Sequence, residues 1–451
     1  MHFIPSEPVT RGEAHADIEL RDWFTAGDRT NSVALLGWAA GGSGRAVSVE
    51  FYQNGTLMAA APLAVERPDV LAAMPGQVSA LRCGFYLRLS KLLLDDKGAL
   101  DVVLYGDADG EPRRTPLGRL IGLPAARRGS KYRERYNPLL VLGMGRSGTS
   151  RLMALLSASP DLLVPGRHPF EVGVANYLWH AAHVLSAPAD HAGSMGPDAF
   201  ASELPNAVGF NPYRHYDWEP GIESEPTVRW MEDELPVACI DFCKRQVDAF
   251  ADSFLAGRAV RPRYIAQKMA MSPARYFVSN VYRGAREIFL VRDFRDVWLS
   301  ARSFNQRRGT PSFGRERFSD DLEWMRGLGH SSRELRLAHQ AAAAHRSLLV
   351  RYEELVADSD AVLARICRWL GSDVSAEATS ARDSIDPEHR TTPEDAVSAG
   401  RWRAEMTAEE RRIAASVFAE DLAYFGYPIE EPARERTSRK PANDFSVTSE
   451  T

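Results

Sequence analysis

The sequence predicts a chain of two folded units: an antiparallel β-sandwich over residues 1–125 and an α/β unit with a parallel sheet and flanking helices over residues 138–430. Three observations predict this. The chain has 451 residues, enough for two or three domains. Its first part contains short alternating or apolar runs separated by turn residues, whereas apolar strands alternate with amphipathic helices after Pro138. A stretch rich in Pro, Gly and Arg separates the two patterns, so we place a linker at residues 126–137.

In the first unit the strand-like runs are SVALLGWAA, AVSVEFYQNG, GFYLRLS and LDVVLYGDADG. Asn-Gly and Asp-Gly pairs favour two-residue hairpin turns, and they occur at Asn54-Gly55 and Asp109-Gly110. This spacing is typical of a small antiparallel β-sandwich. From Glu111 onward the alternation stops, and the composition predicts linker rather than strand as far as the second unit.

In the second unit three apolar runs predict buried strands of a parallel sheet. They are LLVLG (Leu139–Gly143), REIFLV (Arg286–Val291) and SLLVRY (Ser347–Tyr352). A helix is expected from about Thr227 to Leu255. Residues 186–226 are rich in Pro, Gly and aromatic side chains, which predicts a lid or an acceptor pocket. The polar residues 431–451 are expected to form a disordered tail.

Composition and charge exclude several classes of protein. Lys and Arg number 55 against 60 Asp and Glu, a net charge of −5, so the chain has no general positive field to hold nucleic acid. No uninterrupted apolar run reaches the length of about 18 residues that a transmembrane helix needs, and Met1–Glu13 lacks the pattern of a signal peptide. The four cysteines form no metal-binding pattern. We therefore expect a cytoplasmic protein that requires no metal.

The segment from Gly143 to Ser150, GMGRSGTS, follows a predicted strand and leads into a predicted helix. Glycines at such a turn let backbone N–H groups converge, and the helix adds its positive N-terminal end, so the turn suits a phosphate. Further donors are the side chains of Arg146, Ser147, Thr149 and Ser150. Gly143 and Gly148 have the spacing of the G-x-x-x-x-G-K-[ST] pattern, but Thr149 replaces the lysine of nucleotide hydrolases. The alternative is a glycine-rich turn without a ligand.

A second segment, REIFLVRDFRDVWLSARSF, places Arg292 at the end of a predicted buried strand and Ser300 eight residues later in a helix. Open α/β sheets bind ligands at the carboxyl ends of their strands, so Arg292 stands where an anion would bind. A surface ion pair with Asp293 or Asp296 is the alternative.

These two segments resemble the 5′-phosphosulfate loop and the 3′-phosphate segment of sulfotransferases, which use 3′-phosphoadenosine 5′-phosphosulfate (PAPS) as donor. The resemblance covers about residues 137–428 and points to bacterial members related to the tyrosylprotein and carbohydrate branch. It implies the sulfotransferase fold, a P-loop-like parallel sheet with flanking helices. It also implies that PAPS is bound by Gly145, Arg146, Ser147, Gly148, Thr149, Ser150, Arg292 and Ser300.

Two later segments agree with this resemblance. LLVRYEELVADSD resembles the family's strand and following turn, in which Tyr352 matches a nucleotide-contacting tyrosine. HRTTPEDAVSAGRWRAEMT resembles the C-terminal loop that closes on the nucleotide, where Arg403 replaces a lysine; arginine is a strong bidentate phosphate ligand. The implied nucleotide contacts in this loop are Arg390, Gly400, Arg401, Trp402 and Arg403. Core packing is the alternative for Trp402, and solvated loop charge is the alternative for the arginines.

The resemblance implies transfer of a sulfuryl group from PAPS to an acceptor hydroxyl or amine, with release of 3′-phosphoadenosine 5′-phosphate (PAP). Lys268, in YIAQKMAMSP, occupies a place like that of the basic residue on the family's next strand; a surface lysine is the alternative. The acceptor needs a general base, and PGRHPFEV offers both His168 and Glu171. Histidine titrates near neutrality, whereas Glu171 would need a raised pKa, and either residue could instead stabilise the start of a helix. Both candidates stay open.

The class of acceptor also stays open among carbohydrates, lipids and hydroxylated small molecules. Aromatic side chains that could stack on a sugar or an aromatic ring are Phe210, Tyr213, Tyr216 and Trp218. The first unit resembles accessory β domains found beside bacterial glycan-active enzymes, with acceptor binding, homo-oligomer formation or a structural role as alternatives. The competing functions are a P-loop kinase or nucleotide hydrolase, and a glycan-binding protein with a vestigial nucleotide site.

Overall fold

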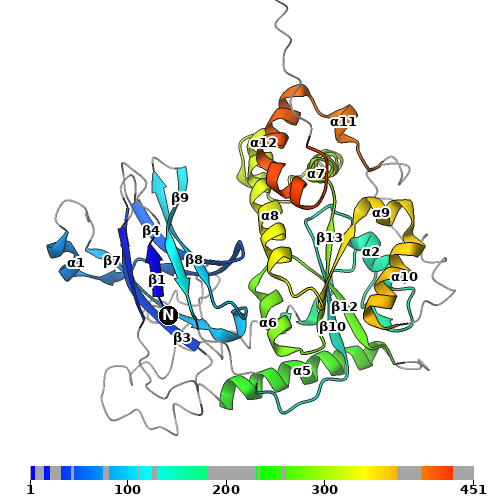
Figure 1. Ribbon diagram of the computed structural model, residues 1–451, viewed down its shortest axis with the longest axis horizontal. Helices are drawn as coiled ribbons and strands as arrows, with labels where there is room; N and C mark the ends of the chain where they lie inside the picture. Colours follow the sequence, from blue (N-terminus) through cyan, green and yellow to red (C-terminus); the bar gives the residue numbers. More distant parts are fainter. Residues whose placement is uncertain are drawn as a thin grey trace, which may run out of the picture.

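The computed structural model describes two units joined through one hydrophobic core (Figure 1). The described residues are 2–5, 15–20, 32–41, 45–74, 81–108, 111–123, 129–175, 177–179, 230, 234–255, 261–372 and 398–429. Antiparallel strands make the N-terminal unit, and a parallel sheet with helices makes the second unit, as the sequence predicts. Among the helices in these ranges, none combines the length and apolar composition of a membrane span.

The N-terminal unit contains two antiparallel sheets. The first has the order β1 (His2–Pro5), β9 (Glu111–Ile121), β8 (Leu100–Ala108), β4 (Arg45–Gln53) and β5 (Thr56–Pro62). The second has the order β2 (His15–Leu20), β3 (Ser32–Ala40), β7 (Arg82–Ser90) and β6 (Val65–Glu66). The short helix α1 (Pro68–Ala73) follows β6 in the chain, and the short helix η2 (Lys91–Leu93) follows β7. Phe51 of the first sheet meets Phe85 of the second edge to face, with ring centroids 5.9 Å apart, so side chains of both sheets share one core.

The predicted turn at Asn54-Gly55 is confirmed. It joins β4 to β5, and both residues have positive φ angles, 50° and 81°, as a two-residue hairpin requires. The predicted turn at Asp109-Gly110 lies outside the described residues, although the flanking strands pair Ala108 with Glu111.

The expectation of a linker from Glu111 onward was wrong for the first part of that stretch, because Glu111–Ile121 forms β9. Two features accommodate its prolines. Pro116 pairs with Val103 beside a shift in register, where a missing N–H donor is tolerated. Strand β1 pairs only with Gly118–Ile121, so within the described residues the proline-containing half of β9 bonds to β8 alone. A strand that is paired on one side only has backbone N–H groups that make no ladder hydrogen bond, so proline, which lacks this N–H, is tolerated there.

The second unit has a five-stranded parallel sheet with β10 at its centre. Its order is β11 (Leu162–Leu163), β12 (Tyr264–Met269), β10 (Asn137–Leu142), β13 (Arg286–Val291) and β14 (Ser347–Arg351), which confirms the three predicted strands. Because the chain leaves β10 toward one side of the sheet and later returns to its other side, the carboxyl ends of β10, β12 and β13 form a topological switch point. Ligands bind there in open α/β sheets.

Helices cover both faces of this sheet. Alternate residues of β10 point to opposite faces: Leu139 and Val141 pack with α2 (Thr149–Leu156) and α10 (Ser359–Leu370), whereas Leu140 and Leu142 belong to the larger core. The larger core takes in α5 (Leu235–Phe254), α6 (Pro273–Val281), α7 (Phe294–Arg308), α8 (Asp321–Ala341) and α12 (Ala408–Tyr424). The remaining short helices are η7 (Arg315–Arg317), α9 (Tyr352–Ala357) and α11 (Trp402–Glu405). Helix α5 lies inside the predicted helix; residues 227–229 and 231–233 lie outside the described part.

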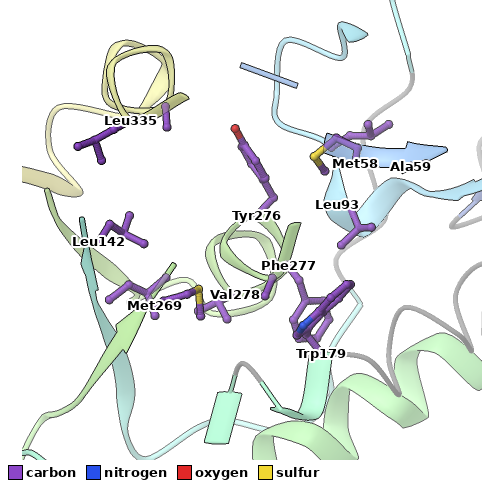
Figure 2. Close-up of a cluster of buried hydrophobic side chains, with 14 of the residues drawn as sticks. Met58, Ala59, Leu93, Leu142, Trp179, Met269, Tyr276, Phe277, Val278 and Leu335 are labelled. Carbon is purple, nitrogen blue, oxygen red and sulfur yellow. The ribbon is translucent and has the colours of Figure 1, made fainter. Parts of the chain in front are cut away.

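The N-terminal unit packs against α6 and α8, which lie between it and the parallel sheet (Figure 1). Figure 2 shows Met58 and Leu93 of that unit near Phe277 of α6, and all three belong to one buried cluster. Asn280 of α6 donates two hydrogen bonds from its side-chain amide, to the carbonyls of Leu92 (2.7 Å) and Leu94 (2.8 Å). The two units therefore share both apolar and polar contacts.

Hydrogen bonds hold residues 129–136 of the predicted linker against α5. Asp241 accepts hydrogen bonds from the Ser130 hydroxyl (2.7 Å) and from two backbone N–H groups. Two turns later on the same helix face, Asp248 accepts from the Tyr132 hydroxyl (2.7 Å) and from the backbone N–H of Arg135 (3.0 Å). The connection between the units therefore has fixed contacts to the second unit.

Candidate active site

The glycine-rich loop, Gly143–Ser150, connects β10 to α2 at the switch point of the sheet. Arg146 and Gly148 both have positive φ angles, 69° and 100°, and Gly148 is the N-cap of α2. A Cβ atom on Gly148 would lie 2.4 Å from the Tyr352 ring, so only glycine fits. The Ser147 hydroxyl is buried and has no hydrogen-bond partner among the described residues. A bound anion oxygen would supply such a partner, so the loop suits a phosphate or sulfate.

Arg292 connects the glycine-rich loop to the C-terminal segment. Its side chain is 3% exposed, and it donates hydrogen bonds to the carbonyls of Arg146 (3.1 Å) and Ser398 (2.6 Å). The guanidinium lies over the Tyr352 ring, 4.4 Å from its centroid. The expected alternative is an ion pair with Asp293 or Asp296. In the structure Asp293 pairs with Arg295 at 2.7 Å, and Asp296 accepts hydrogen bonds from the backbone N–H groups of Gly400 and Trp402.

Arg146 and Ser300, which belong to the two sequence motifs, lie together. The Arg146 Nε donates to the Ser300 hydroxyl at 3.4 Å, and the guanidinium lies 4.6 Å from the centroid of the Phe304 ring. Burial, helped by the charges of Arg292 and Arg307, lowers the pKa of Arg146 to about 10. Positive groups gathered in a buried place have an excess of charge that an anion would neutralise.

The C-terminal segment Ser398–Arg403 lies over Arg292 and α7. The Ser398 hydroxyl is 2.8 Å from the Tyr352 hydroxyl. The ring of Trp402 is buried with the guanidinium of Arg295 3.5 Å from its centroid, so packing accounts for this tryptophan. Arg401 is turned toward Glu405, to which it donates at 2.7 Å, and Arg403 lies 4.6 Å from the Trp402 ring. The predicted contact Arg390 lies outside the described residues.

Lys268 joins the loop to one of the two candidate bases. It lies on β12 opposite Val141 of β10, and its ammonium group donates to the Ser150 hydroxyl (3.2 Å), the Pro169 carbonyl (2.8 Å) and Glu171 (2.5 Å). The Glu171 side chain is 67% exposed, so an acceptor can reach it. The His168 ring approaches the Phe170 ring edge-on, with ring centroids 6.0 Å apart.

Sequence reasoning missed several side chains of this site. Asp296 accepts from backbone N–H groups of the C-terminal segment, and Phe313 packs on Gly145, where a Cβ atom would come within 2.6 Å of its ring. Gln267, next to Lys268, accepts from the N–H of Ala175 at 2.9 Å and so holds the chain that follows Glu171. The helical spacing of Asp296 and Ser300, four residues apart, was the available signal for the first of these.

The sequence also predicts aromatic residues in an acceptor pocket and no requirement for a metal. The aromatic residues proposed to line an acceptor pocket, at positions 210, 213, 216 and 218, lie outside the described residues. Within the described ranges there is no group of three or more side chains that could hold a metal ion.

The chain is similar in sequence to one protein family and in structure to several solved proteins. The model of the sulfotransferase family matches residues 138–376, which is more than half of the chain. No curated protein sequence matches significantly. The sulfotransferase domain from the curacin biosynthetic pathway is 14% identical, covering 66% of this chain and 100% of its own, with a TM-score of 0.36.

Two other solved structures are similar at the same level. The sulfotransferase domain from the Synechococcus PCC 7002 olefin synthase is 20% identical over 67% of this chain and 100% of its own, with a TM-score of 0.34. A mouse sulfotransferase complexed with PAP is 12% identical to this chain. The match covers 64% of this chain and 85% of the mouse chain, with a TM-score of 0.34. Because these TM-scores are low, the family assignment rests on the sequence match.

Proposed function

Because the chain belongs to the sulfotransferase family, we propose that the site around the glycine-rich loop binds PAPS and transfers its sulfuryl group to an acceptor hydroxyl or amine. The activity itself follows from the family, and so does the donor, which supplies the sulfuryl group and leaves as PAP. Family membership sets aside the kinase and the non-catalytic alternatives. We further propose a role for each site residue and the classes of acceptor.

One observation carries the donor-site proposal: residues from two separate segments, the glycine-rich loop and residues 292–300, meet at the carboxyl ends of β10 and β13. Arg292 bonds to the loop carbonyl of Arg146, whose own guanidinium reaches Ser300. The loop amides, with Arg146, Ser147, Thr149 and Ser150, would hold the 5′-phosphosulfate, whose oxygens need many donors. Arg292 and Ser300 would hold the 3′-phosphate.

Glu171 is the base that the geometry favours. Its carboxylate contacts Lys268, and Lys268 contacts Ser150 at the start of α2. An acceptor between Glu171 and the loop would give its proton to the carboxylate as its oxygen bonds to sulfur, while the bond from sulfur to the leaving phosphate breaks. Lys268 and the loop donors would stabilise the charge that develops on the transferred group and on the phosphate.

The experiment is sulfuryl transfer from labelled PAPS to a panel of carbohydrate, lipid and phenolic acceptors, measured for Glu171→Gln and His168→Ala. Loss of a general base lowers turnover by a factor of about 10² to 10⁴. We expect that loss for Glu171→Gln, with unchanged affinity for PAP, and a change of less than about threefold for His168→Ala. The reverse ranking would assign the base to His168.

The organisation of the chain is also part of this proposal. The two N-terminal sheets would form a β-sandwich around the core that holds Phe51 and Phe85, and the contacts of Asn280 favour a structural role for this unit over a tethered module. The four described cysteines are all buried free thiols, which supports a reducing compartment such as the cytoplasm. Carbohydrates, lipids and small molecules remain the proposed classes of acceptor.

A further inference from the structure

Asp296 is completely buried at the start of α7, and the donor-site roles proposed above make no use of it. One oxygen of its carboxylate accepts a hydrogen bond from the backbone N–H of Gly400 (2.5 Å), and the other accepts from the N–H of Trp402 (2.9 Å). These N–H groups lie more than a hundred residues later in the chain, at the start of α11. The carboxylate therefore acts on this short helix as an N-cap residue acts, but from another element.

Ser300, which is proposed to bind the 3′-phosphate of PAPS, lies on the same face of α7 as Asp296. Asp296, Ser300 and Ser303 follow one another at intervals of four and three residues, which places them on one side of the helix. Ser303 accepts a hydrogen bond from Arg401 at 3.4 Å. The C-terminal segment is thus attached to α7 on both sides of Ser300 along the helix.

The position of this segment determines the surroundings of Arg292. Ser398, two residues before Gly400, accepts from Arg292 through its carbonyl (2.6 Å) and meets Tyr352 through its hydroxyl (2.8 Å). The Gly400 backbone has a φ of +77°, which turns the chain between these contacts and Trp402. If the N–H bonds to Asp296 were lost, the carbonyl that orients Arg292 would lose its support.

We propose that Asp296 is a positioning residue for donor binding: its carboxylate fixes residues 400–402 on α7, and this places Ser398 against Arg292 beneath the 3′-phosphate. The inference rests on the proposed function, because it assumes that Arg292 holds that phosphate. Hydrogen bonds to a charged acceptor are the stronger kind, so one side chain can hold the segment through its backbone, whatever side chains the segment carries.

The chemistry of the buried carboxylate agrees with this role. Burial raises the pKa of Asp296 to about 6, although Arg292 and the N–H groups of Trp402 and Gly400 act in the opposite direction. An apolar residue at this position would avoid the penalty of burying a charge. The hydrogen bonds of Asp296 to the C-terminal segment therefore explain a carboxylate at this buried position better than a contribution to folding stability does.

The test compares Asp296→Ala and Asp296→Asn with the wild-type chain. Asp421→Asn is the matched control, since Asp421 is also a buried acceptor, but it lies on α12 and accepts hydrogen bonds from Ser332 and Arg336 of α8. The measurements are the calorimetric Kd for PAP, kcat and KM for PAPS, and hydrogen exchange of the amides in residues 398–405.

For Asp296→Ala we expect the Kd for PAP and the KM for PAPS to rise by about 10- to 100-fold, because two hydrogen bonds to a charged acceptor are lost. We expect kcat to change by less than about threefold and exchange to quicken in residues 398–405. The asparagine variant should recover part of the affinity, because its amide oxygen still accepts one N–H bond.

Unchanged affinity for PAP in Asp296→Ala would overturn the inference, and so would an equal loss in the Asp421→Asn control. If the alanine variant does not fold, the asparagine variant decides: normal exchange in residues 398–405 together with wild-type affinity would again overturn it. Failure of the proposed function has a different signature, since the wild-type chain itself would then show no affinity for PAP.

Discussion

Replacement of Arg292 by methionine removes one guanidinium and keeps most of the side-chain volume. In the structure this group is 3% exposed, and it makes two hydrogen bonds to carbonyls at 3.1 Å and 2.6 Å. Those two bonds support the site for any nucleotide, whereas contacts with the 3′-phosphate exist only for PAP. A hydrogen bond to a charged group contributes about 1.5–3 kcal/mol, so a bidentate contact with this phosphate is expected to contribute about 3 kcal/mol or more.

The assay that separates the two contributions is calorimetry with PAP and with AMP, which lacks the 3′-phosphate. About 3 kcal/mol corresponds to a ratio of about 100 in affinity. We expect the wild-type chain to prefer PAP over AMP by at least that ratio and Arg292→Met to show little preference. Arg302→Met is the control, because Arg302 lies on α7 and pairs with Glu410 at 2.6 Å, away from the proposed phosphate contacts.

An equal loss of affinity for PAP and AMP would refute the reasoning. Arg292 would then be a bridge between two backbone carbonyls and not a ligand of the 3′-phosphate. Because the comparison is a ratio within one protein variant, partial loss of folded protein does not mimic the expected result.

Three further predictions follow from single contacts. Gly148→Ala should weaken PAP binding in calorimetry by about tenfold or more, because a Cβ atom would lie 2.4 Å from the Tyr352 ring and φ is +100°; unchanged affinity would contradict the loop geometry. Asn280→Ala should lower the free energy of unfolding in urea by about 2–4 kcal/mol, since two buried carbonyls of the N-terminal unit lose their donors, and an unchanged midpoint would argue against the observed docking. Asp296 has its pKa raised from 3.8 to about 6, so its contribution to stability is present below pH 3.8 and is lost as the pH rises through 6. Relative to Asp296→Asn, the wild-type chain should therefore lose about 2–3 kcal/mol between pH 4 and pH 7 in urea titrations, and a constant difference would disprove the shift.

The elements that sequence patterns predicted well are those that depend on neighbouring residues. The run LLVLG and the glycines after it specify a buried strand and a tight turn, and the structure has β10 and the glycine-rich loop there. Arg292 and Ser300 are eight residues apart at a strand end and in the following helix, so local spacing places both near the carboxyl end of β13. Their contacts with the glycine-rich loop, about 150 residues earlier in the chain, follow instead from the pairing of β10 with β13.

Where the sequence patterns gave a wrong prediction or left two candidates open, the cause lies outside the segment concerned. Glu111–Ile121 contains two prolines, and whether such a run can be a strand depends on which of its edges is paired. Which of the two candidate bases, His168 or Glu171, contacts Lys268 depends on a strand about a hundred residues away, and Glu171 makes that contact. No pattern within PGRHPFEV contains that information.

The amino-acid sequence by itself determined the class of each unit, the glycine-rich turn after the first strand of the parallel sheet and the family, because periodicity, turn residues and short motifs are properties of adjacent positions. Only the tertiary structure decided which of the two candidate bases contacts Lys268, that Asp296 bonds to the C-terminal segment, and that the N-terminal unit packs on α6. The physical reason is that each of these contacts joins groups far apart in the chain, and their distances are set by how the sheet and the helices pack.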